Sequence, residues 1–437
     1  MTSLHPLRPR ARTGLRRRAL AALWATAATL AAGLFSPAAQ AVPSYARQTG
    51  MDCAGCHIGA FGPQLTPAGL RFKLGGYTDT DGQAGKLPLS GMLVASMTHT
   101  RQTQDPAPDF LKGNNNLTLD EASLFLAGRW SEHVGSFVQV THDGIAHSDA
   151  LDQTDVRWAT PLTLAGRDSI VGVSLNNNPG VQDPFHTMPV WSAPFVSSPS
   201  GFGTGDAGTL LDEGLAGRVL GLNAYTMFGK NVYAELGSYR SMSDTLQKRL
   251  GQGSDPQRLA GNAYWRLAWM DNGTREAWHA GLFGWTARLQ ADRLAGGAKD
   301  SYRDVGVDAG YQFLGTRERT WTVDASLLNE QQRVGADGSR GHLNELRLNA
   351  THHWQQTCGL GGGLFATTGS DPAATTRGLM LQADWTPWGK ESASAPAPFA
   401  WANVRLGTQL WHYSSFGGER SGASGHDTLF LFAWSAF

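Results

Sequence analysis

The sequence predicts an all-β fold, an antiparallel transmembrane β-barrel of about sixteen strands over residues 88–437, preceded by a short segment. Two patterns predict the barrel. Short segments alternate apolar with polar residues, and the connections between them are alternately short and long. No stretch after the amino-terminal region approaches the roughly 18 consecutive apolar residues that a membrane-spanning helix needs. We therefore expect any membrane crossing to be made by strands.

The first 41 residues have the pattern of an export signal. A stretch with six arginines is followed by an apolar run over residues 19–35 and then by Ala39-Gln40-Ala41, a small-residue cleavage pattern. The apolar run is shorter than the roughly 20 residues of a membrane anchor. We expect residues 1–41 to be a signal peptide and the mature chain to begin near Val42.

The charge of the mature chain excludes one class of partner. Six of the 36 basic residues lie in the first 41 residues and all 36 acidic residues lie after them, so the remainder has a net charge of about −6. Nucleic-acid binding needs clustered positive charge. The sequence therefore predicts no nucleic-acid partner, and it leaves a cationic partner open.

Residues 53–57 carry the clearest chemical motif. Cys53-Ala54-Gly55-Cys56-His57 is a C-x-x-C-H pattern, the attachment signature of haem c. Two thiols can form thioethers with the haem vinyl groups, and the adjoining imidazole can bind the iron. A redox disulfide is the main alternative, and a zinc site is disfavoured because only two thiols are near. Cys358, the remaining cysteine, has no predicted role.

The haem segment is predicted to span residues 42–87. So short a chain is close to the size that cannot fold without help, so haem and a wall from the barrel are both needed. We expect it to pack against or inside the periplasmic mouth of the barrel. The sixth ligand of the iron is not fixed by the sequence, and the candidates in the first strand are Met92, Met97 and His99.

The barrel strands show their two faces in the sequence. Residues 304–313, 321–327 and 379–386 each alternate apolar and polar side chains, as a strand between lipid and water requires. Arg266, Asp308, Arg347 and Arg405 are predicted to face the lumen, and the aromatic Trp285, Trp388 and Trp411 to face outward near strand ends. A soluble β-sandwich or propeller is the rival fold.

The connections predict which side of the membrane each end occupies. Residues 131–134, 229–231, 271–274 and 315–319 are tight turns, whereas 102–116, 179–213, 241–256 and 414–426 are long. Short turns are periplasmic in such barrels. With an even number of strands, both ends lie on the short-turn side. Residues 390–398 form one longer connection there.

Several segments resemble a known family. Residues 41–50 leading into Cys53 and His57, then 63–69 and 71–77, resemble the fused monohaem cytochrome-porins of the bacterial outer membrane, and residues 176–184 also look like a family segment. The resemblance implies that Cys53, Cys56 and His57 attach and ligate the haem. Its best-known members oxidise extracellular ferrous iron. The sequence departs from the family over residues 58–62 and at Leu70.

These observations predict an electron-transfer protein in the bacterial outer membrane. Electrons would pass from an extracellular donor, expected to be Fe(II), through haem c to a periplasmic cytochrome or another soluble carrier. Residues 142–149, with Asp152 and Asp155, are a candidate for transient iron binding, although a solvated acidic loop explains them as well. The alternatives are a diffusion porin with a haem-bearing plug or gate, and a haem enzyme acting on peroxide or a small oxidised anion.

Overall fold

The computed structural model describes residues 43–188, 193–212, 214–253, 255–294, 296–389 and 403–437. The predicted signal peptide, residues 1–41, and the predicted longer connection at residues 390–398 lie outside the described residues.

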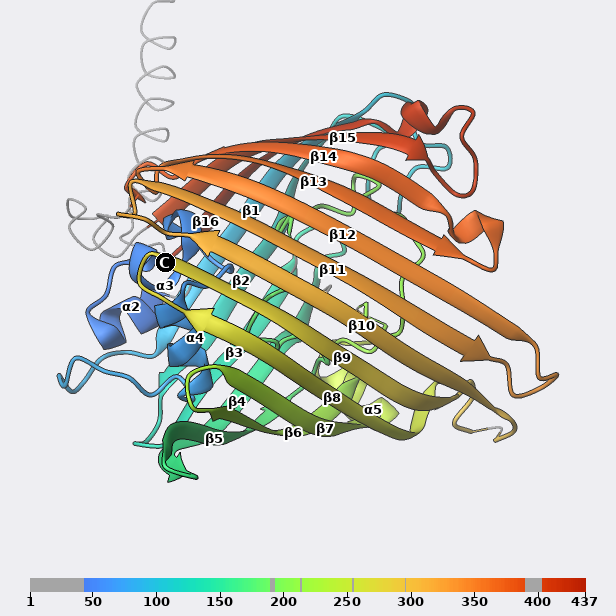
Figure 1. Ribbon diagram of the computed structural model, residues 1–437. Helices are drawn as coiled ribbons and strands as arrows, with labels where there is room; N and C mark the ends of the chain where they lie inside the picture. Colours follow the sequence, from blue (N-terminus) through green and yellow to red (C-terminus); the bar gives the residue numbers. More distant parts are fainter. Residues whose placement is uncertain (1–42, 189–192, 213, 254, 295, 390–402) are drawn as a thin grey trace, which may run out of the picture.

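The described chain forms a closed antiparallel barrel of sixteen strands (Figure 1). Each strand pairs with its neighbours in the sequence, and β1 closes the ring against β16, with Met92 opposite Ala436. The predicted fold and strand number are confirmed. The strands are β1 (Leu89–Thr100), β2 (Asn116–Arg129), β3 (Val134–Asp143), β4 (Ser148–Leu164), β5 (Arg167–Asn176), β6 (Val219–Phe228), β7 (Val232–Ser241), β8 (Arg258–Asn272), β9 (Glu276–Gln290), β10 (Lys299–Phe313), β11 (Arg319–Arg333), β12 (Arg340–Trp354), β13 (Cys358–Gly369), β14 (Thr376–Trp385), β15 (Asn403–Ser415) and β16 (Thr428–Ala436).

The alternation in the sequence is the alternation between the two faces of the wall. In β10, Val305 and Val307 are exposed on the outside, whereas Asp304 and Asp308 are buried in the lumen. Apolar residues cover the outer face of nearly every strand, and a surface of this kind is stable against lipid rather than water. The charged residues predicted to face the lumen do so.

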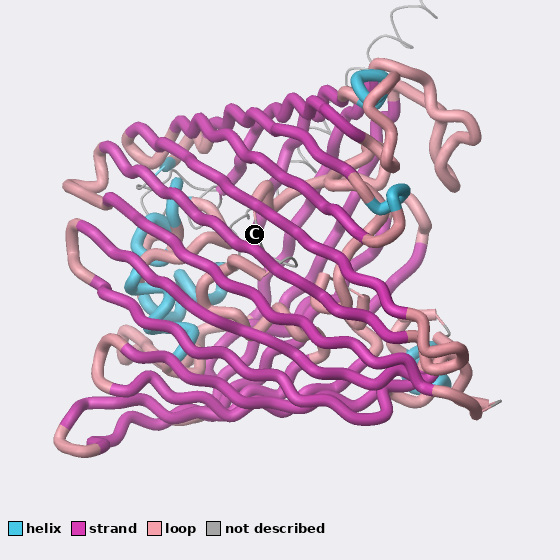
Figure 2. Tube along the Cα trace, turned by 45° about the vertical axis from the view of Figure 1, so that its right-hand side comes forward, coloured by secondary structure: helices cyan, strands magenta, loops and turns pink. Residues whose placement is uncertain are grey.

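Short connections gather at one end of the barrel and long ones at the other (Figure 2). The chain begins β1 and ends β16 at the short-turn end. The longer connections at the opposite end include α5 (Asp244–Arg249), η3 (Pro372–Ala374) and η5 (Ala423–His426). No helix among the described residues is long and apolar enough to span a membrane.

The predicted outward aromatic residues need correction. Trp285 and Trp411 are buried, 1% and 6% exposed, and point into the lumen. The phase of the strand decides this, because Leu282 in β9 and Leu410 in β15 already occupy the outward positions. Other tryptophans do form a girdle at the short-turn rim. They are Trp130, Trp158, Trp269, Trp278, Trp321, Trp354 and Trp385.

An N-terminal plug, residues 43–87, occupies the short-turn end of the barrel, with its helices inside and its exposed residues 79–85 outside (Figure 1). Its elements are α2 (Pro43–Thr49), α3 (Cys53–Cys56), η1 (Ile58–Ala60) and α4 (Pro67–Leu74). Thr66 caps α4 by accepting a hydrogen bond from Gly69, and Pro67 occupies the first turn, where its missing N–H costs nothing.

The connection between β5 and β6, which we call the inner loop, also enters the lumen. Its described residues lie in 177–218, and they include buried Val181, Phe185 and Met188. The sequence predicted a long outer loop here. The loop instead turns inward because its apolar residues find a core there. Val181 joins one hydrophobic cluster with residues of the plug and of the barrel wall.

Candidate haem site

The C-x-x-C-H motif forms one helical turn followed by an extended residue. Cys53 and Cys56 begin and end α3, and the backbone N–H of His57 donates to the Cys53 carbonyl oxygen at 2.8 Å. Residues three apart in a helix lie on the same face. The two thiols therefore have the placement that attachment to a single flat ring requires.

The residues after the motif hold this turn in place. Thr66 donates from its hydroxyl to the Gly55 carbonyl oxygen at 2.7 Å and from its N–H to that of Cys56 at 2.9 Å. The Ile58 N–H donates to the Gln64 carbonyl oxygen at 3.0 Å. The motif thus lies in a closed loop fastened to the start of α4.

His57 has the state that an iron ligand requires. Its side chain lines a cavity, and its Nδ1 atom is buried and has no hydrogen-bond partner among the described residues. Burial lowers the pKa of His57 to about 4, while the backbone of Gln64 and Pro63 acts in the opposite direction. The ring is therefore neutral near pH 7, and neutral imidazole is the form that binds metals.

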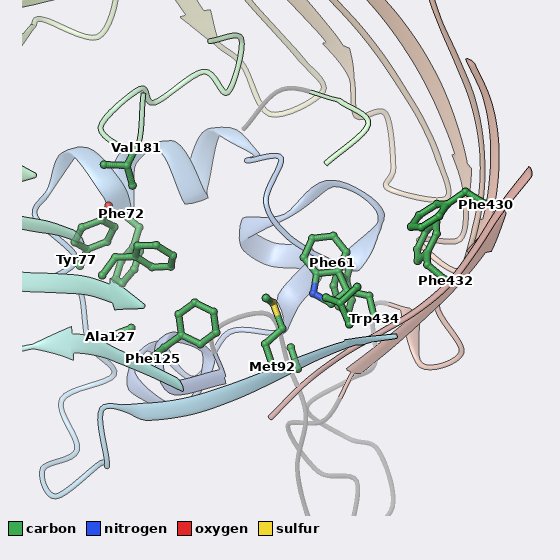
Figure 3. Close-up of a cluster of buried hydrophobic side chains, with 13 residues drawn as sticks. Phe61, Phe72, Tyr77, Met92, Phe125, Ala127, Val181, Phe430, Phe432 and Trp434 are labelled. Atoms are coloured by element: carbon green, nitrogen blue, oxygen red, sulfur yellow. The ribbon is translucent and has the colours of Figure 1, made fainter. Parts of the chain in front are cut away.

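The cavity has a volume of about 330 Å³ and lies where the plug, the barrel wall and the inner loop meet. Figure 3 shows the aromatic side chains in this region. Phe72 and Tyr77 come from the plug, and Phe125 and Trp434 come from the barrel wall. Its other lining residues include Cys56, His57, Lys73, Met92 and His186. A largely apolar space lined by the Cys56 thiol and a neutral imidazole, with Cys53 in the same helical turn, fits haem c.

The three predicted candidates for the sixth ligand separate in space. Met92 lines the cavity and is buried. Met97 is 40% exposed on the outer face of the barrel. His99 is exposed and its Nδ1 atom lies 2.9 Å from Asn115 Oδ1. Since Met97 and His99 do not line the cavity, the expectation that either reaches the iron is corrected, and of these three Met92 remains.

Two residues of the site were missed in the sequence. Lys73 and His186 both line the cavity, one from α4 and one from the inner loop. Burial and the charge of Arg157 lower the pKa of Lys73 to about 8, and burial together with Lys73 lowers the pKa of His186. Their sequence neighbours gave no signal, because the contacts that unite them with His57 are long-range.

Hydrogen bonds fasten the plug to the barrel on many sides, so the site has a fixed position in the lumen. In some of them the plug is the donor, and in others the barrel is. The hydrogen bonds are Tyr45 to the Ser136 carbonyl (2.6 Å), the Gly59 N–H to Gln356 (2.8 Å), Gln64 to Asp324 (2.7 Å), Tyr77 to Asp155 (2.7 Å), Tyr225 to the Leu74 carbonyl (2.7 Å), Gln312 to the Leu65 carbonyl (2.8 Å) and Asn403 to the Ala60 carbonyl (2.7 Å).

The alternatives for the two thiols fit less well. Burial raises the pKa of the Cys56 thiol to about 11, whereas a redox-active dithiol depends on a lowered thiol pKa. Among the described residues, no group of three or more His, Cys, Asp or Glu side chains is placed to hold a metal ion. Residues 142–149, the predicted iron-binding segment, therefore form no such group, and His142 Nδ1 lies 2.8 Å from Asp149 Oδ1.

The barrel is similar to solved outer-membrane proteins. An anion-selective porin from Comamonas acidovorans is 12% identical (TM-score 0.48; 80% of this chain and 98% of that chain are covered). The outer-membrane channel DcaP of Acinetobacter baumannii is 13% identical (TM-score 0.45; 80% and 96%). Outer-membrane expressed OmpT of Vibrio cholerae is 9% identical (TM-score 0.43; 82% and 98%).

No protein-family model matches the sequence, and a comparison with curated proteins finds no match. The strand pairing of the described residues defines a closed antiparallel barrel of sixteen strands.

Proposed function

We propose that this chain is an electron-transfer protein of the bacterial outer membrane that carries one covalent haem c in its plug. An extracellular donor, Fe(II), would supply electrons, and a soluble periplasmic cytochrome would accept them. One observation carries the proposal. The C-x-x-C-H turn lies within the lumen of a barrel, and its His57 lines a largely apolar cavity there.

The surface of the barrel supports the location. Its outer face is apolar and its wall is closed, so the backbone groups of the strands are paired within the wall, as a membrane demands. Short turns are periplasmic and long loops extracellular in bacterial barrels. The plug, at the short-turn end, would then meet periplasmic partners, whereas the donor would approach from the long loops.

The residues of the chain would hold and tune the cofactor. Cys53 and Cys56 would bind it covalently and His57 would ligate its iron, which supplies one-electron chemistry. Phe72, Phe125 and Trp434 would exclude water from its faces, and burial of this kind is one of the means by which a protein sets a haem potential.

Fe(II) as the donor rests on the resemblance of the plug sequence to cytochrome-porins and on a physical argument. Oxidised iron is poorly soluble near neutral pH, and a barrel keeps it outside the cell. Only an electron then has to cross an apolar band about 25 Å tall.

Rapid mixing of the purified holoprotein with Fe(II) tests the proposal. The haem absorbance bands should show fast reduction, and His57→Ala should abolish it. His133→Ala is the matched control, because this histidine lies at the short-turn end and contacts the Ala159 carbonyl oxygen rather than the cavity. A covalent haem that stays oxidised with Fe(II) but accepts electrons from other donors would remove iron as the donor.

The barrel topology also supports a second candidate, a diffusion porin in which the plug acts as a gate. Conductance across a planar bilayer separates the two. A diffusion porin predicts steady channels whose conductance rises when the plug is deleted, together with a haem that does not react with Fe(II).

A further inference from the structure

A second histidine shares the cavity with His57. His186 belongs to the inner loop, is buried, and lines the same cavity as His57. The two side chains come from separate parts of the fold. His57 belongs to the plug, and His186 belongs to the inner loop, which follows β5 and enters the lumen. A flat cofactor in the cavity would therefore be approached by two imidazoles.

The inner loop is built to present His186. The Asp183 carboxylate accepts hydrogen bonds from the backbone N–H groups of Phe185 (3.0 Å), Thr187 (3.0 Å) and Met188 (3.1 Å). These residues flank His186 on both sides. One carboxylate thus fixes the turn from which the imidazole projects.

The backbone of His186 itself is in an uncommon conformation. Its φ is +55°, in the left-handed region that non-glycine residues rarely adopt. Such conformations persist where the surrounding structure determines them, and they gather at functional sites. Here the Asp183 hydrogen bonds supply the constraint.

Both neighbours of the loop hold Asp183 in position. Arg266 of β8 lies 3.6 Å from its carboxylate and also pairs with Asp308 of β10. From the plug, Lys73 donates to the carbonyl oxygens of Val181 and Asp183, each at 2.8 Å. The loop that carries His186 is therefore fixed relative to the helix that follows the C-x-x-C-H motif.

We propose that His186 is the second axial ligand of the haem iron that His57 holds, so that the site is six-coordinate with two histidines. This inference rests on the covalent haem of the proposed function. Among the other side chains lining the cavity, Lys73 is already engaged by two carbonyl oxygens, and Met92 lies within the apolar cluster. The carboxylates of Glu121 and Asp152 also line the cavity, and they accept hydrogen bonds from Gln139 and Thr141 of the barrel wall. An iron with both axial positions filled exchanges electrons but offers no open site for peroxide or a small anion.

Absorbance and electron paramagnetic resonance spectra of the holoprotein test this ligation without measuring iron oxidation. The wild-type haem should be low-spin in both oxidation states and should bind carbon monoxide poorly. His186→Ala should lose the low-spin spectrum and bind carbon monoxide rapidly. Added imidazole should restore the low-spin spectrum, which a merely structural role of His186 would not predict.

Two further variants complete the test. Met92→Leu tests the competing ligand in the cavity, and His279→Gln is the control, because it removes a buried histidine that stacks on Phe185 at 4.3 Å but does not line this cavity. Both should keep the wild-type spectrum. A low-spin spectrum retained in His186→Ala, or lost in Met92→Leu instead, would overturn the ligation while leaving the haem in place. Absence of covalent haem from the wild-type protein, seen in a pyridine haemochrome assay, would overturn the proposed function as well.

Discussion

The side-chain ammonium of Lys73 donates a 2.8 Å hydrogen bond to the backbone carbonyl oxygen of Asp183. This bond joins the plug to the inner loop, two segments that the barrel wall holds independently. Since His57 belongs to one segment and His186 to the other, the geometry of the cavity depends on how firmly they are joined.

Lys73→Met should loosen this junction. The variant leaves two buried carbonyl oxygens without their donor, which costs roughly 1–3 kcal/mol of folding free energy, with part of the loss offset because a buried cation is removed. Urea unfolding in detergent would measure it. Lys248→Met is the control, because this lysine is exposed and pairs with Asp244 across one helical turn. Equal effects of the two variants would contradict the structural role of Lys73.

Gly59→Ala should disturb the plug more than the same change at Gly82. Both glycines have a positive φ, +65° and +83°, so alanine is strained at each by about 1–2 kcal/mol. At Gly59 the added Cβ would also clash with His353 Nε2, whereas at Gly82 nothing among the described residues lies within 4 Å. Overpacking should add about 1–3 kcal/mol at Gly59 alone.

Limited proteolysis of the plug and the yield of covalent haem per barrel would measure this difference. The two variants share the backbone cost, so their comparison isolates the contact with the wall. Similar protease resistance in both would mean that the plug does not dock on β12 as described.

Cys56→Ser should abolish covalent haem and leave the barrel folded. The thiol takes no part in the strand pairing, so heat-modifiable migration on gels, the mark of a folded barrel, should be unchanged. Cys358→Ser is the matched control, since Cys358 is exposed at the start of β13. Haem staining of denaturing gels should be lost in the first variant and kept in the second. Loss in both would contradict attachment at the C-x-x-C-H motif.

Much of the fold was predictable because lipid and water impose opposite demands on neighbouring residues. Val305 and Asp304 could be assigned to faces from type alone, since a misplaced charge in lipid is costly. Aromatic residues carry less information. Trp285 and Trp411 pack as well inside as outside, so the phase of their strands, not their type, places them in the lumen.

The site was predictable only where it is local. Cys53, Cys56 and His57 share one turn, and their spacing alone indicates haem attachment. His186 reaches the cavity because its loop folds inward, which depends on tertiary contacts such as Asp183 with Arg266. No spacing of residues in the sequence predicts that this loop turns inward. Met97 and His99 were candidate ligands because they follow the motif closely in the chain. Neither lines the cavity, because Met97 faces outward and β1 runs away from the plug toward His99.

The ion pair between Arg266 and Asp308 yields the largest predicted loss of stability. Both side chains are fully buried, and Arg266 also faces Asp183 at 3.6 Å. Removing one partner of a buried pair costs about 3–5 kcal/mol, because the charge left behind is neither paired nor solvated. Arg266→Met should therefore lower the free energy of unfolding by about that amount and should also release the loop that presents His186.

Arg218→Met is the comparison variant, because it removes the arginine of a more exposed ion pair. Its partner Asp255 is buried and lies 3.6 Å away, but the Arg218 side chain is 45% exposed and solvated, so its loss should cost less than the loss of the fully buried Arg266. Urea unfolding followed by tryptophan fluorescence would give both values. If the two variants lost similar stability, Arg266 would not be the anchor of the inner loop. If Arg266→Met kept the wild-type haem spectrum despite a large loss, the position of His186 would not depend on Asp183.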